Sequence, residues 1–423
     1  MSIENPEKYK EFKTETLMNA LNSHPFTVEN YKKFIQEKSD YLDKSFSVNN
    51  IAQLLLARSQ LNDSIVISVS EKFFKQNKVS INVIAVGGYG RNELHPYSDT
   101  DLLLLIKKNE KKAFQDILAK FLTFLWDIGI QVGHSTRTLQ ECMEEGSKDL
   151  TVATSLMETR YLFGSMTKYQ ILEKKITSNK LLWSNTQFLE GKKNEQISRH
   201  SQFNNTAYNL EPNIKSGPGS LRDIHSIFWV GKKILGIQKL QELNELEVIS
   251  NQQLSMLIHS RDFLCSIRYA LHALTQRKED RLLFDYQRTL AKQFDYHDEQ
   301  YLLGVEQFMQ DYYKSAKTIS RLNEIILQIY SQKLFRSKKS KIITLNHSFQ
   351  IRDNLVELRK GIQFKDNPSL LLEIFLLFQK HKNIQGIGSK TIGMITENLH
   401  LIDDSFRENT ENKKLFLDIL KAP

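Results

Sequence analysis

Two aspartates in one short stretch are the residues of this sequence best suited to chemistry. Asp99 and Asp101 are separated by Thr100 and lead into the apolar run 102–106. Side chains two apart on a β-strand point to the same side, about 7 Å apart along the chain. Two carboxylates held in this way can bind divalent cations, as in two-metal phosphoryl and nucleotidyl transfer. We therefore expect a metal site at Asp99 and Asp101.

A pair of glycines ahead of the aspartates suits the same chemistry. Gly87 and Gly88 follow the β-branched run 81–86 and precede the polar stretch 89–98. Because glycine has no Cβ, backbone N–H groups at such a turn can approach phosphate oxygens closely. Either motif alone is common as a turn or as a polar start of a strand. Together, in the order strand, glycines, loop, aspartates and strand, the two motifs favour metal and phosphate binding. Two like charges beside a leucine run cost stability unless a cation compensates them.

The pattern around these motifs predicts a small sheet set among helices. Residues up to about 78 show helical periodicity, and the stretch 89–98 has no helical stripe. The expected strands are 81–86, 99–106 and 130–137. The expected helices are 110–127, 149–162, 221–235, 250–274 and 299–330. Between them, 209–220 is rich in Gly, Pro and Asn and is expected to be an ordered loop or a linker.

Composition excludes several classes of protein. The chain has 423 residues, which allows two or three domains, and a net charge of +9, a mild preference for anionic partners. Cys142 and Cys265 stand alone, which argues against a disulfide framework or a zinc site. The N-terminus lacks a signal-peptide pattern, and no apolar run approaches the length of a membrane span. We expect a cytoplasmic protein that does not bind membranes.

Three other motifs are only weak evidence for a functional site. The doublet His297-Asp298 lacks the surrounding ligands of a metal-dependent hydrolase and is expected to be a coincidence. The stretch GIGSKT, 386–391, departs from a phosphate-binding loop at Ser389, so a turn beside a helix is favoured. The basic run 332–341 is expected to be a solvated linker, and a nucleic-acid partner is therefore unlikely.

The stretch VIAVGGYGRNELHPYSDTDLLLL, 83–105, resembles the nucleotidyltransferase signature of the bacterial PII uridylyltransferase family. The resemblance continues in the family's order and covers most of 80–420. Its further segments are 126–142, 149–164, 208–230, 268–291 and 367–378. It implies an α+β fold, with a small mixed-sheet domain of the DNA polymerase β-like type packed on a mainly helical domain. The expected divisions are 1–148, 149–335 and a helical segment 336–423.

The family resemblance also implies an activity. UMP would be transferred from UTP to a tyrosine hydroxyl of a PII-type nitrogen regulatory protein, with Mg²⁺ or Mn²⁺ and release of pyrophosphate. The family continues into a metal-dependent phosphohydrolase domain and glutamine-sensing domains, whereas this sequence ends at Pro423. Uridylyl removal and glutamine sensing are therefore expected to be absent. Two alternatives stay open: a regulatory module that binds nucleotide or a partner without turnover, and the same chemistry on another acceptor.

The resemblance assigns roles to seven residues. Gly87 and Gly88 match the glycines that cradle the triphosphate, and Asp99 and Asp101 match the catalytic, metal-binding pair. Nucleotide-binding roles are also expected for Arg91, Lys215 and Arg222. For Arg91 a structural role is an equal alternative. For Lys215 and Arg222 the alternative is that they only flank an ordinary helix start, capped by Ser220.

Three positions depart from the family pattern: Asn92 and Ser220 replace a usual glycine, and Thr100 replaces a usual apolar residue. Asn92 stands where the family has glycine, and since asparagine tolerates positive φ the loop is expected to survive the change. The third carboxylate of related nucleotidyltransferases is missing from the stretch 130–137. Asp149, Glu93 or a loop residue are the open candidates for it.

Overall fold

The chain folds into two compact units, each assembled from two stretches of sequence. The computed structural model describes residues 9–110, 112–178, 183–335, 342–381, 384 and 386–422. Unit 1 joins 1–225 with 259–317, and unit 2 joins 226–258 with 318–423. Three helices begin in one unit and end in the other: α10 (Leu221–Leu235), α12 (Asn251–Thr275) and α14 (Gly304–Phe335). The expected divisions at 148 and 335 stay predictions.

Unit 1 contains a four-stranded mixed sheet in the order β3-β2-β1-β4. The strands are β1 (Asn82–Ala85), β2 (Thr100–Leu105), β3 (Val132–Arg137) and β4 (Arg160–Phe163). Strand β1 pairs antiparallel with β2 and β4, and β3 runs parallel to β2 with Gly133 opposite Asp101. The three expected strands are confirmed, each slightly shorter than its pattern, and so is the mixed α+β class.

The expected helix 149–162 is wrong in its second half. Helix α7 (Leu150–Met157) ends early, and Arg160–Phe163 then forms β4. This segment pairs with the edge of β1 that β2 leaves free, which satisfies backbone groups that a helix would have paired locally.

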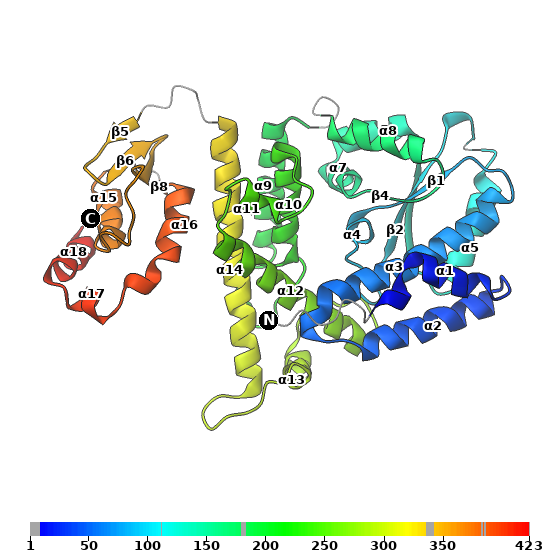
Figure 1. The fold of residues 1–423 in the computed structure, drawn as a ribbon, viewed down its shortest axis with the longest axis horizontal. Helices are drawn as coiled ribbons and strands as arrows, with labels where there is room; N and C mark the ends of the chain where they lie inside the picture. The colour runs from blue at the N-terminus through cyan, green and yellow to red at the C-terminus, as the bar shows by residue number, and fades with distance from the viewer. Residues whose placement is uncertain are drawn as a thin grey trace. The chain divides into compact units, whose positions relative to one another are not determined.

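Helices cover the sheet of unit 1, as Figure 1 shows. Helix α3 (Ile51–Ser70) lies against β4 and α5 (Gln115–Asp127), and its residues Leu54, Leu61 and Ile65 are fully buried at helical spacing. This confirms the helical periodicity before residue 78. The other helices assigned here are α1 (Thr14–Asn22), α2 (Val28–Lys44), α4 (Gly87–Gly90), α6 (Leu139–Lys148), α8 (Met166–Thr177), α9 (Asn185–Ser201) and α13 (Phe284–Gln293).

Helices α10, α12 and α14 confirm three of the expected long helices, with 209–220 as a loop before the first of them. Short 3₁₀ turns occupy Lys10–Phe12, Val48–Asn50, Lys108–Glu110 and Leu399–Leu401, and a π-helical turn occupies Glu71–Lys75. Among the helices of the described ranges, none is long and apolar enough to cross a lipid bilayer.

Unit 2 holds a second sheet, in the order β5-β6-β7-β8. The strands are β5 (Ile342–Thr344), β6 (Phe349–Arg352), β7 (Leu355–Leu358) and β8 (Gly386–Ile387). The helices of this unit are the short α11 (Glu242–Glu245), α15 (Leu370–Lys380), α16 (Ser389–Glu397), α17 (Asp404–Glu408) and α18 (Thr410–Lys421). Phe349, Val356 and Ile374 belong to its core.

The expectation of a purely helical segment after 336 is therefore wrong. Strands β6 and β7 form a hairpin whose turn residues, Asp353 and Asn354, have φ of 50° and 60°. Positive φ at both central residues is the requirement of a type I′ turn, for which Asp and Asn are suited.

Candidate active site

The glycine turn and the aspartate pair meet in the structure. Strand β1 ends at Ala85, and Gly87 follows with a φ of +60°, a left-handed conformation that glycine adopts without strain. A Cβ on Gly87 would lie 3.3 Å from Oδ2 of Asp101, and the amide of Val86 donates to the carbonyl of Asp101 at 3.0 Å. Asn92 has a φ of 60°, which confirms that asparagine takes the left-handed position in this loop.

Asp99 lies close enough to Asp101 to influence the ionisation of that carboxyl group. Burial, followed by the charge of Asp99, raises the pKa of Asp101 above its ordinary value. Asp99 precedes β2 and accepts a hydrogen bond from Nζ of Lys278, with 42% of each side chain exposed. The contact between Asp99 and Lys278 is thus a partly exposed ion pair and not a buried salt link.

Gly133 keeps space beside the second carboxylate. It pairs with Asp101 across β2 and β3, and a Cβ there would lie 2.4 Å from Oδ1 of Asp101. Any larger residue would therefore displace the carboxylate.

The two carboxylates fit a divalent cation whose remaining coordination positions are filled by a bound nucleotide. Mg²⁺ is commonly held by one or two carboxylates together with substrate phosphates and water. In the part of the chain that the structure describes, no three His, Cys, Asp or Glu side chains form a metal-binding group. Asp149 accepts the amides of Thr151 and Val152 at 2.6 and 3.1 Å, and Glu93 is held by Arg91. Neither open candidate for a third carboxylate therefore joins the pair.

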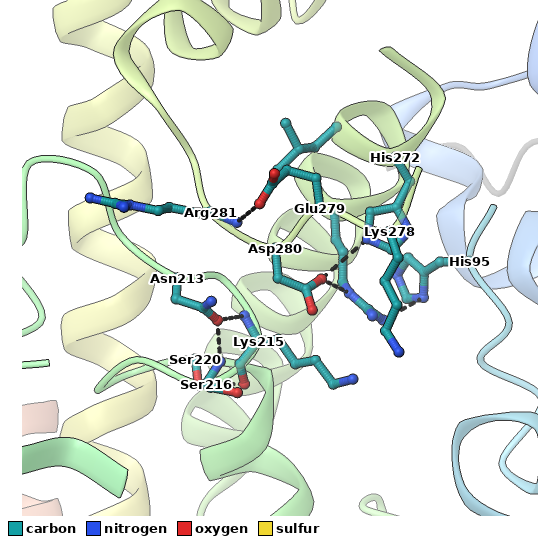
Figure 2. A network of polar contacts seen from close by, with 12 residues as sticks. His95, Asn213, Lys215, Ser216, Ser220, His272, Lys278, Glu279, Asp280 and Arg281 are labelled. Carbon is teal, nitrogen blue, oxygen red and sulfur yellow. Dashed lines mark hydrogen bonds and ion pairs between the residues drawn. The ribbon is translucent and has the colours of Figure 1, made fainter. Parts of the chain in front are cut away.

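Two lysines lie beside the aspartates and come from distant parts of the chain. Figure 2 shows the ammonium groups of Lys215, from the loop 209–220, and Lys278, from the segment after α12, pointing into the same region. Burial, followed by the charge of Arg268, lowers the pKa of Lys215 to about 8. Lys215 forms no hydrogen bond or ion pair through Nζ within the described ranges, so its charge is available to an anionic ligand.

A polar network holds the segment that carries Lys278. Oδ1 of Asp280 accepts from Nε of Arg268 at 2.7 Å and faces Nε2 of His272 at 3.1 Å (Figure 2). Burial opposes the charge of Asp280, but these two partners outweigh it and keep its pKa below the usual range. Arg268 also contacts Nδ1 of His95 at 3.0 Å. The network thus joins the end of α12 to the loop that leads into Asp99.

The loop 209–220 is fixed by side chains rather than by a sheet or helix. Oδ1 of Asn213 accepts the amides of Lys215 and Ser216 at 3.1 and 2.7 Å (Figure 2). The hydroxyl of Ser220 donates to the carbonyl of Lys215 at 2.8 Å, so Ser220 closes the loop ahead of α10. Asp223, fully buried, accepts the amide of Gly219 at 2.7 Å.

The two arginines with expected nucleotide-binding roles differ in their surroundings. Arg91 donates from Nε to Glu93 and from Nη1 to Glu158, at 2.7 and 2.6 Å, and its Nη2 lies 3.2 Å from Nε2 of His225. These contacts favour the structural alternative for Arg91. Arg222 lies on the first turn of α10, where its amide donates to the carbonyl of Lys215 at 2.9 Å. Its role in nucleotide binding stays a prediction.

Lys278, Arg268 and Asp280 were not among the expected site residues. All three lie within the stretch 268–291, which carries the family resemblance, but no spacing in the sequence connects them with the aspartates. His272 is fully buried and also contacts the carbonyl of Pro96 at 2.6 Å.

The affinity for a nucleoside triphosphate is expected to fall as the pH rises through about 8, because Lys215 then loses its charge. A hydrogen bond to a charged group contributes about 1.5–3 kcal/mol, and the protonated fraction of Lys215 falls about tenfold between pH 7 and 9. The dissociation constant should therefore increase about five- to tenfold over this range. Calorimetric titration with UTP at both pH values measures this. In Lys215→Arg, whose guanidinium stays charged, the pH dependence should disappear; an unchanged slope would contradict the assignment.

Comparison with known proteins first shows similarity to a general class, the nucleotidyltransferases. Residues 67–176, which contain the glycine turn and both aspartates, match the family described as nucleotidyltransferase domain. Residues 187–327 match the GlnD PII-uridylyltransferase family, and 349–423 match the uridylyltransferase GlnD third domain. The resemblance to the bacterial PII uridylyltransferase family is therefore confirmed along most of the chain.

Curated relatives agree with the family matches. The chain is 41% identical over 392 residues to the bifunctional uridylyltransferase/uridylyl-removing enzyme of Nitrosococcus oceani, covering 92% of this chain and 44% of the relative. It is 40% identical over 405 residues to the enzyme of the same name from Stutzerimonas stutzeri, covering 95% of this chain and 45% of the relative. The chain thus spans less than half the length of these relatives.

Proposed function

We propose that this chain transfers UMP from UTP to a tyrosine hydroxyl of a PII-type protein and releases pyrophosphate. The observation that carries the proposal is the proximity of three features: the aspartates Asp99 and Asp101, the glycine turn at Gly87, and the positive charge of Lys215. Carboxylates for a cation and ammonium groups for phosphates are the two requirements of a nucleoside triphosphate site. The similarity to uridylyltransferases supports the choice of UTP and of a PII-type acceptor.

In the proposed reaction, Asp99 and Asp101 hold Mg²⁺ or Mn²⁺. When bound, the metal neutralises the triphosphate and activates the attacking hydroxyl. The turn at Gly87 and Gly88 lets the phosphate chain approach the backbone, and Lys215 and Lys278 balance its charge. Arg222 contributes positive charge from α10. The tyrosine oxygen forms a bond to the α-phosphorus, the bond to the β-phosphate oxygen breaks, and the tyrosine proton is released with pyrophosphate.

The test is the release of pyrophosphate from UTP and Mg²⁺ in the presence of a purified PII protein, together with the mass of that protein. Transfer of one uridylyl group increases its mass by the mass of UMP less water. The variant Asp99→Asn is expected to bind the PII protein and to release no pyrophosphate.

Two alternatives would give different results. A regulatory module would bind UTP without any release above the Asp99→Asn background. The same chemistry on another acceptor would release pyrophosphate only when that acceptor replaces the PII protein. A cytoplasmic location and the absence of uridylyl removal stay predictions.

A further inference from the structure

A cavity of about 660 Å³ lies in unit 2 and contains none of the residues discussed for the active site. Its walls are the last turns of α14, strands β6 and β7, the turn that follows β7, and the first turns of α16. Binding cavities for small molecules typically have volumes of about 300–1,000 Å³. The cavity therefore has the size of a site for a single small ligand.

The walls carry a clear excess of positive charge. Five cationic side chains line the cavity: Lys333, Arg352, Arg359, Lys360 and Lys390. Among the described lining residues, two carry a carboxylate, Glu247 and Glu357. Like charges held around one cavity repel each other unless an anion enters between them.

Three of these cations lack a counter-charge within the described ranges, and a fourth, Arg352, forms an ion pair with Glu357 but leaves a donor unsatisfied. Within the described ranges Lys333, Lys360 and Lys390 form no ion pair, and the buried Nε of Arg352 has no hydrogen-bond partner. The carboxylate Oε2 of Glu357 lies 3.7 Å from that Nε, which is too far for a hydrogen bond. A ligand with several acceptor oxygens would satisfy these groups.

The first turn of α16 adds a second, independent feature. Gly388 precedes this nine-residue helix and has no side chain of its own to accept from the first amides, and the first turn contains no acidic residue. The carboxylate of Glu357 lies beside it, since a Cβ on Gly388 would be 3.4 Å from Oε1 of Glu357. It contains Lys390 instead, although a cation is unfavourable at the positive end of a helix. A bound anion would reverse that cost, because it would accept from both the amides and the ammonium group.

The start of α16 is also held rigidly against the sheet. Oγ1 of Thr391 accepts the amide of Leu358 at 3.1 Å, and the amide of Gly388 donates to the carbonyl of Val356 at 2.9 Å. The turn after β7 is held by Arg359, whose Nη1 donates to the carbonyls of Asn346 and His347 at 3.2 and 3.1 Å. The basic residues are thus presented on a fixed frame.

We propose that this cavity binds a small ligand with two or more linked phosphate groups, either free oligophosphate or a nucleoside di- or triphosphate. Net positive charge, helix-start amides and an arginine with an open donor are the groups that recognise phosphate oxygens. The cavity volume suits one such molecule and not a nucleic-acid strand. The inference does not depend on the proposed transfer activity, because it uses none of the active-site residues.

The experiment measures amide hydrogen exchange of the full chain with pyrophosphate, ATP, UTP or citrate, each at millimolar concentration. Pyrophosphate or a nucleotide is expected to slow exchange in 389–394 and 358–363. Stronger protection by pyrophosphate would assign the cavity to free oligophosphate, and stronger protection by ATP or UTP to nucleotides. Absence of protection with every phosphate ligand, or equal protection by citrate, would overturn the proposal.

Variants locate the effect. In Lys360→Glu/Lys390→Glu the protection at 389–394 is expected to disappear, while the protection that UTP causes at 87–91 persists. The exposed Lys414→Glu on α18 is the matched charge control and should change neither. The milder Lys360→Gln, at an exposed position, should keep the fold and weaken pyrophosphate binding about tenfold, the effect of losing one charged hydrogen bond. Unchanged binding in Lys360→Gln would also overturn the proposal.

Discussion

Replacing Asp101 by asparagine is expected to lower the rate of nucleotidyl transfer about a thousandfold or more while the chain stays folded. The substitution removes one of the two carboxylates that hold the metal, whose stabilisation of the transition state amounts to several kcal/mol. Single-turnover measurements with saturating UTP, Mg²⁺ and a PII protein report the loss directly. The dissociation constant for UTP without metal should change far less.

The stability of Asp101→Asn should be equal to that of the parent chain or slightly higher. The pKa of Asp101 is raised, so its ionised form is disfavoured in the folded state, and this penalty appears as the pH rises past the carboxyl's ordinary value. Asparagine removes the penalty together with the repulsion from Asp99. The control is Asp116→Asn on the exposed side of α5, which should alter neither rate nor melting temperature. A clearly lower melting temperature of Asp101→Asn would contradict this account.

Replacing Asp223 by alanine is expected to destabilise unit 1 by about 3–5 kcal/mol, the cost of removing one partner from a buried ion pair. Asp223 is fully buried and accepts from Nη2 of Arg199 at 2.5 Å, besides its bonds to Gly219 and His200. At about 2–4 °C per kcal/mol, the melting temperature should fall by about 10 °C. Calorimetry and urea unfolding both measure this change.

The stabilisation by Asp223 is expected to depend on pH in a definite direction. Burial opposes the charge of Asp223, but the hydrogen bond from His200 and the charge of Arg199 outweigh it and lower the pKa. The carboxylate therefore contributes stability above its unfolded pKa, and the contribution is lost as the pH falls through the lower folded value. In Asp223→Ala, the free energy of unfolding should therefore decrease less as the pH falls than it does in the parent chain.

Two further variants control for the loss of Asp223. Asp127→Ala, at the exposed end of α5, should have almost no effect on stability. In Arg199→Met/Asp223→Ala the loss should be smaller than the sum of the single losses, because no charge is left unpaired. A change below about 2 °C in Asp223→Ala would refute the role of this pair.

Sequence reasoning reached the parts of the site that are local in the chain. The β-branched run before Gly87 depends on neighbouring residues only and appears in the structure as β1, and the run after Asp99 appears as β2. Strand β2 begins at Thr100, so the expected alternation of Asp99 and Asp101 on one strand stays a prediction. The left-handed conformation of Asn92 followed from the family pattern, which has glycine at this position, together with the tolerance of asparagine for positive φ.

The rest depended on long-range packing. Lys278 contacts Asp99 across 179 positions of sequence, and no spacing rule connects residues so far apart. Strand β4 was missed because its pairing partner, β1, lies far upstream and its own residues continue a helical pattern. The hairpin of unit 2 had a usable signal, the turn residues Asp353 and Asn354, but its strands of four residues were too short to show alternation.

The divided composition of unit 1 has a consequence for synthesis. A growing polypeptide emerges from the ribosome in order, yet Lys278 and the Arg268–Asp280 pair belong with a sheet made long before, and residues 226–258 of the other unit come between them. The first 225 residues therefore wait as an incomplete intermediate until about 90 more have been translated, as the boundary at 317 indicates. Nascent chains stalled before and after that point should differ sharply in their resistance to protease.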